Sequence, residues 1–123
     1  MSIGLILPED NQKNVSITLF GEKFSLLIDD VKQVEFKNDF NVGIRGNKLS
    51  LNDTHCNEII IKNNARELAN YIKVDPVIAG RGFHWQKSID IKVLGDLVVK
   101  NIDQQLFVIN KIFLEDYLMC VAT

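Results

Sequence analysis

The chain is poor in the residues that cross-link or interrupt small folds. Among its 123 residues are two cysteines, two prolines and one tryptophan. The cysteines, Cys56 and Cys120, lie far apart and form no Cys-x-x-Cys pair of the kind that supplies zinc ligands. A disulfide framework is therefore excluded, and we expect two separate buried thiols, with one disulfide between them as the alternative. We expect no metal and no cofactor.

Long apolar runs and an excess of basic charge are also missing. No apolar segment approaches the roughly 20 residues that a membrane-spanning helix needs, so we expect no membrane span. Residues 1–10 lack a basic region followed by a long apolar stretch, so they are not a secretory signal peptide. The 14 basic and 16 acidic side chains are spread along the chain and give a net charge of −2. Nucleic-acid binders gather basic residues on one face, so we expect no nucleic-acid partner.

What the chain does contain is strand patterning. Hydrophobic residues make up 46% of the sequence, enough for a globular core. Apolar and polar residues alternate over 15–19 and 24–28, which predicts two half-buried strands, and we expect these to form a hairpin around Gly21. Similar runs predict strands at 33–37, 40–45, 48–51, 58–62, 89–93, 96–100 and 105–110. The expected fold class is mainly β with minor α (α+β), built from antiparallel strands and hairpins.

Two segments carry helical spacing instead. Residues 64–74 place apolar side chains on one helical face and are closed off by Pro76, and for so short a segment helix and non-helix remain open. Near the C-terminus the apolar residues recur at i, i+3, i+4 and i+7, a helical stripe made of Leu114, Tyr117, Leu118 and Val121. Glu115 and Asp116 in its first turn complement the helix dipole. We expect a short C-terminal helix start there.

The stretch Gly80-Arg81-Gly82 is the one flexible joint that the sequence suggests. We expect it to divide the chain into a β-rich N-terminal module, residues 1–79, and a second unit, residues 80–123. Directly after the joint, Arg81, His84 and Trp85 combine an aromatic face with hydrogen-bond donors, a combination that suits a saccharide subsite on a loop. These three are the candidate substrate-binding residues. The competing interpretation is that Trp85 starts a strand and fills the core.

The second unit carries a family resemblance. Gly95 precedes the strand at 96–100, a polar turn follows, and the strand at 105–110 ends in Ile109-Asn110. A helix opening comes next, Leu114-Glu115-Asp116-Tyr117-Leu118. In order and spacing these pieces resemble the start of the stage II sporulation protein D family, which includes the amidase-enhancer proteins. The resemblance covers roughly the last quarter of the chain.

That resemblance implies a bacterial cell-wall function linked to sporulation. Family members act as lytic transglycosylases on glycan strands without peptide stems, or enhance cell-wall amidases. The implied partners are peptidoglycan glycan strands or such an amidase, and the implied location is the cell envelope. The family's catalytic glutamate lies in a Ser-Glu-Met triplet after a glycine- and valine-rich turn. Here Met119 to Thr123 occupies the turn, so the triplet would follow Thr123.

We therefore expect no catalytic residue in this chain. The leading hypothesis is an incomplete sporulation-D-like domain preceded by a β module, a fragment that scaffolds and holds glycan without cleaving it. The alternative is a non-enzymatic β-rich binding or interaction module in which the helix opening is coincidental. A third class, a thiol-dependent enzyme, would need a reactive Cys120.

Overall fold

The computed structural model describes residues 1–79 and 87–113. The described residues form twelve strands and one 3-10 helix: β1 (Ser2–Ile6), η1 (Pro8–Asp10), β2 (Asn14–Phe20), β3 (Phe24–Ile28), β4 (Val31–Lys32), β5 (Asp39–Arg45), β6 (Lys48–Leu51), β7 (Thr54–Cys56), β8 (Glu58–Asn63), β9 (Tyr71–Ala79), β10 (Lys87–Val93), β11 (Asp96–Ile102) and β12 (Gln105–Lys111). Within these ranges no helix is long and apolar enough to cross a membrane. The expectation of a mainly β chain is confirmed. The helix start expected from Leu114 lies outside the described residues.

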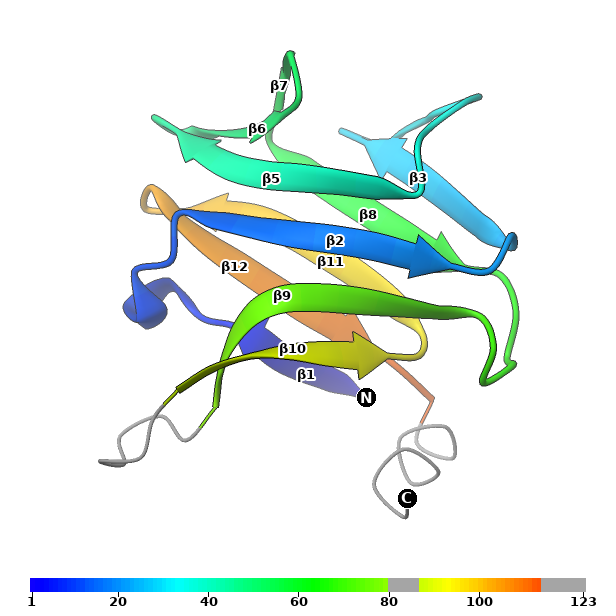
Figure 1. The fold of residues 1–123 in the computed structure, drawn as a ribbon. Coiled ribbons are helices and arrows are strands. Elements are labelled where there is room, and N and C mark those ends of the chain that lie inside the picture. The colour runs from blue at the N-terminus through cyan, green and yellow to red at the C-terminus, as the bar shows by residue number, and fades with distance from the viewer. Residues whose placement is uncertain (80–86, 114–123) are drawn as a thin grey trace.

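The strands form two six-stranded antiparallel sheets that pack face to face (Figure 1). The first sheet has the order β1-β12-β11-β8-β3-β4, and the second has the order β10-β9-β2-β5-β6-β7. The two sheets bury one shared layer of side chains between them, which makes the fold a β-sandwich.

Alternation along the strands builds the core. In β2, Val15, Ile17 and Leu19 are buried while the residues between them face outward. In the other sheet, Ile59 and Ile61 of β8 point into the same layer and are completely buried. Each such side chain contributes about 1.5–3 kcal/mol when it leaves water, so the shared layer is the main source of stability.

Each of the two sheets contains strands from before residue 80 and strands from after it. β11 pairs with β8, with Leu97 opposite Ile61, and β12 pairs with β1, with Lys111 opposite Ser2. In the other sheet, β10 pairs with β9. Buried residues from before and after the expected joint belong to the same core. The described residues of the expected modules 1–79 and 80–123 therefore form one packing unit.

The expected hairpin of residues 15–19 and 24–28 is wrong. β2 lies in the second sheet and β3 in the first, where β3 pairs with β8 and β4. The turn between them carries the chain across the sandwich, and Gly21 adopts a φ of 118° there. Neighbouring strands in a sequence pair only when their turn reverses the chain within one sheet.

Two further local predictions are also wrong. Residues 64–70 form a loop, and Tyr71 starts the nine-residue strand β9, so the helix considered for 64–74 is not formed. Pro76 does not end an element but lies within β9, where the pairing with β10 shifts register between Ile89 and Ile91. A bulge of this kind accommodates a residue without a backbone N–H. The strand expected at 33–37 is irregular, with Phe36 packed against the core.

Candidate ligand-binding site

A hollow of about 420 Å³ lies where β1 starts, β11 starts and β12 ends. Its walls come from four separated segments of the chain. They are Met1 and Ser2, then Asn63, Ala65 and Arg66, then Leu94, Gly95 and Asp96, and finally Lys111, Ile112 and Phe113. We call this hollow the β12-end pocket. Its volume falls in the range of small-molecule sites, about 300–1,000 Å³.

The turn before β11 forms one wall, and its shape depends on Gly95 and Asn110. Gly95 has a φ of 83°, and a Cβ placed on it would overlap the carbonyl oxygen of Lys111. Asn110 is 2% exposed, and its Nδ2 donates to the carbonyl oxygens of Leu94 at 2.7 Å and of Asp96 at 3.0 Å. The asparagine therefore holds both sides of the glycine turn against β12.

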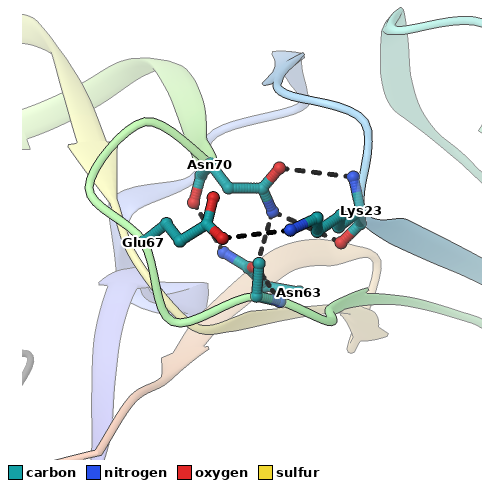
Figure 2. A network of polar contacts seen from close by, with 5 residues as sticks. Lys23, Asn63, Glu67 and Asn70 are labelled. Carbon is teal, nitrogen blue, oxygen red and sulfur yellow. Dashed lines mark hydrogen bonds and ion pairs between the residues drawn. The ribbon is translucent and has the colours of Figure 1, made fainter.

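An asparagine network fixes the loop that brings Arg66 to the pocket (Figure 2). Asn70 is 3% exposed, and its Nδ2 donates to Asn63 Oδ1 at 2.7 Å. The same side chain donates to the carbonyl oxygen of Lys23 and accepts from the Lys23 N–H. Asn63 Nδ2 donates in return to the carbonyl oxygen of Asn70 at 2.9 Å. These bonds close residues 63–70 into a loop anchored on the turn before β3.

Asp96 links this loop to the glycine turn. Its Oδ1 accepts the backbone N–H of Asn63 at 2.8 Å. The carboxylate therefore joins the start of β11 to the end of β8, directly beside the pocket. Because it already accepts a backbone hydrogen bond, Asp96 has a positioning role in the wall.

The chemistry of the pocket comes from an aromatic ring and two cations. The Cζ atom of Arg66 lies 4.2 Å from the centroid of the Phe113 ring, a cation–π contact. Phe113 is 59% exposed, although it is a large apolar residue. Lys111 adds a second cation to the wall. The exposed ring can stack on the apolar face of a ligand. The guanidinium and the ammonium beside it can donate hydrogen bonds to the oxygens of the same ligand.

Arg81, His84 and Trp85 lie outside the described residues, as do Glu115, Asp116 and Cys120. Within 1–79 and 87–113, no group of three or more His, Cys, Asp and Glu side chains could hold a metal ion.

Cys56 is a free, buried thiol, 1% exposed on β7. Burial raises the pKa of the thiol, and the nearby Asp29 carboxylate raises it further, while Lys48 opposes both. The thiolate, the reactive form, is therefore disfavoured in the folded chain.

In a Cys120→Ser background, iodoacetamide should alkylate Cys56 at least about tenfold more slowly in the folded chain than in denaturant. The cause is burial together with the raised pKa. Mass spectrometry of timed samples measures both rates. Equal rates with and without denaturant would contradict a buried, protonated thiol.

Sequence reasoning missed the residues that form the β12-end pocket because their signals are weak. Arg66 was placed in a helical candidate, and Asp96 in a generic strand. Gly95 and Asn110 did appear in the resemblance to the sporulation-D family, and they are the signals that pointed to this end of the fold. Comparison of the chain with protein-family models, with curated proteins and with solved structures finds no match.

Proposed function

We propose that this chain is a non-catalytic, glycan-binding part of a peptidoglycan-active protein, and that the β12-end pocket holds the glycan. The observation that carries the proposal is the exposed Phe113 ring, which has Arg66 stacked on it and Lys111 on the same wall.

The chemistry of a stem-free glycan strand suits these groups. Sugar rings present apolar C–H faces that pack on aromatic rings, and their hydroxyl and acetamido oxygens accept hydrogen bonds. A strand without peptide stems also carries a free lactyl carboxylate on each muramic acid. Arg66 and Lys111 can each pair with such a carboxylate.

The resemblance to the sporulation-D family supports the choice of glycan. Its strand–turn–strand segment corresponds to β11 and β12, which form two walls of the pocket. Gly95 and Asn110 both belong to the matching pattern, and Asn110 Nδ2 donates to the carbonyl oxygens of Leu94 and Asp96 on either side of Gly95. The part of the chain that carries the resemblance thus supplies part of the pocket, namely Gly95, Asp96 and residues 111–113.

A second candidate is an interaction module without enzymatic heritage. The observation that favours it is the closed core, in which strands from β1 to β12 bury one continuous layer of side chains. Residues 1–79 and 87–113 already form this layer together. A domain that only binds a partner needs a stable core and a binding surface, and it needs no catalytic residues.

Phe113→Ala should weaken binding of a soluble stem-free glycan tetrasaccharide about three- to tenfold, because stacking on an aromatic ring is lost. Lys111→Met should weaken the same ligand a few-fold and leave binding of chitotetraose, which has no carboxylate, unchanged. Heteronuclear NMR titration of the full chain measures each dissociation constant and locates the shifts.

Phe20→Ala is the matched control, because Phe20 is 38% exposed, lies on the second sheet and does not line the pocket. It should bind both sugars as the unchanged chain does. Absence of saturable binding by the folded, unchanged chain would leave the interaction module as the remaining candidate. Equal binding by Phe113→Ala would rule out this pocket as the site.

A further inference from the structure

One edge of the sandwich is a long, regular strand. Among the described residues the two sheets end in the edge strands β1, β4, β7 and β10. β4 has two residues and β7 has three, and the pairing of the five-residue β1 with β12 shifts register between Gly4 and Ile6. β10 has seven residues, and Figure 1 shows it along the outer edge of the second sheet. β10 is therefore the edge best suited to pair with a further strand.

β10 has few of the devices that keep edge strands from pairing with other chains. Such edges are commonly short, or carry a proline, a bulge or an inward-pointing charge. β10 contains no proline and no glycine. The register shift in its pairing with β9 places the extra residue on β9, where Asp75 and Pro76 together lie opposite Asp90. The backbone of β10 itself is therefore not bulged.

The side chains of β10 alternate between the two faces of the sheet. Ile89 and Ile91 lie opposite buried valines of β9, and Val93 is itself buried, so these three residues face the core. The two isoleucines are only partly buried. Asp90 and Lys92 lie between them on the outer face, and both are exposed. A strand added at this edge would cover the isoleucines and would meet one charge of each sign.

The two charges of β10 lie beside like charges of their own chain. Lys92 is directly opposite Lys73 of β9, and Asp90 faces the bulge that contains Asp75. Like charges opposite one another destabilise a strand pair. In the described part of the chain, neither Asp90 nor Lys92 forms a hydrogen bond or an ion pair through its side chain, although the Lys92 ammonium lies 5.6 Å from the centre of the Tyr71 ring. Both charges would therefore gain from an opposite charge on an added strand.

A second copy of β10, running antiparallel, supplies these opposite charges in one register. When Ile91 lies opposite Ile91 of the second copy, Asp90 of each copy lies opposite Lys92 of the other. On the inner face Ile89 then lies opposite Val93, so apolar side chains also meet. Sliding one strand by two residues sets Asp90 against Asp90 or Lys92 against Lys92, and sliding it by one exchanges the two faces. Charge and face together select a single register.

We propose that two copies of this chain pair through β10 and join their six-stranded second sheets into one continuous sheet of twelve strands. Such a contact is two-fold symmetric, with Ile91 on the axis. Main-chain hydrogen bonds between the two β10 strands provide the attraction, and the two Asp90–Lys92 pairs fix the register. The interface is one strand pair wide, so the dissociation constant of the dimer is about 10–100 μM.

Sedimentation velocity of the full chain over about 5–500 μM should show a monomer–dimer equilibrium. Asp90→Lys sets lysine against lysine on both sides of the axis, so it should weaken the dimer at least about tenfold. The double variant Asp90→Lys with Lys92→Asp should dimerise as the unchanged chain does. Asp39→Lys is the matched control, because Asp39 is an exposed aspartate on β5, an internal strand of the same sheet. It should leave the equilibrium unchanged.

Disulfide trapping tests the register directly. In a Cys120→Ser background, Ile91→Cys should cross-link two chains under mild oxidation, because residues directly opposite each other have Cα atoms about 4.5–5.5 Å apart. Ser88→Cys, on the exposed face of the same strand, does not lie opposite its own copy and should cross-link at least about tenfold more slowly. Non-reducing electrophoresis of timed samples measures both rates. A chain that stays monomeric over the whole concentration range overturns the proposal. Undiminished dimerisation of Asp90→Lys, or equal cross-linking of the two cysteine variants, overturns it as well.

Discussion

Gly95→Ala is expected to destabilise the fold by about 3 kcal/mol or more, which lowers the melting temperature by roughly 10 °C. Two costs combine. The φ of 83° disfavours any residue with a Cβ, and the new Cβ would overlap the carbonyl oxygen of Lys111 and lie 2.9 Å from the Cα of Ile112. These are backbone atoms at the end of β12, so the clash is not relieved by turning a side chain. Thermal unfolding followed by circular dichroism measures the change.

Gly46→Ala separates these two costs. Gly46 also has a positive φ, 60°, but a Cβ added there would meet no atom within 4 Å. Replacing Gly46 should cost only the strain of a positive φ at a residue with a Cβ, about 1 kcal/mol. A Gly95→Ala chain no less stable than the Gly46→Ala chain would mean that the turn before β11 is free to move away from β12.

Asn70→Leu is expected to lower the free energy of unfolding by about 2–4 kcal/mol. Leucine has a similar size but makes no hydrogen bonds. The change leaves the Lys23 N–H without the acceptor that Asn70 supplies, and the Asn63 Oδ1 and the Lys23 carbonyl oxygen each lose one of two donors. A buried polar group that loses its partner costs about 1–3 kcal/mol, and three groups are affected here. Urea unfolding monitored by fluorescence gives the free energy.

Asn64→Leu is the control, because the exposed Asn64 side chain makes a single bond, from Nδ2 to Ser25 Oγ at 2.8 Å. That replacement should cost less than about 1 kcal/mol. Since the network also anchors the loop of Arg66, Asn70→Leu should weaken glycan binding as well. A loss as small as that of Asn64→Leu would show that the loop at 63–70 does not depend on the buried amide.

Strand positions were predictable because alternation is a local property. Val15, Ile17 and Leu19 indicated both the position of β2 and the face that it buries. The isoleucine run at residues 59–61 indicated the position of β8 but not the face that it buries. In a half-buried strand, side chains on one face contact the core and those on the other contact water. A few alternating residues are therefore enough to indicate the strand.

Pairing was not predictable, because it depends on which sheet each strand joins. Nothing near Gly21 distinguishes a turn that reverses the chain from one that crosses between layers. Tyr71 to Ala79 was missed for a related reason. Pro76 was taken as an end signal, yet the bulge against β10 tolerates it inside β9.

The shape of the β12-end pocket could not be predicted from any spacing in the sequence. Its walls come from segments at Ser2, Asn63 to Arg66, Leu94 to Asp96 and Lys111 to Phe113, which are brought together only after both sheets have formed. No spacing within the sequence relates these segments.

The pairing of β1 with β12 has a consequence for how the chain folds during synthesis. Ser2 lies opposite Lys111, and β11 inserts between β8 and β12. The first sheet is therefore incomplete until nearly all of the described sequence has left the ribosome, and the second waits for β10. Such distant pairings are slow to form, typically in milliseconds to seconds. Until they do, β8 exposes an unpaired, isoleucine-rich edge, so the nascent chain is most prone to aggregation just before β11 emerges.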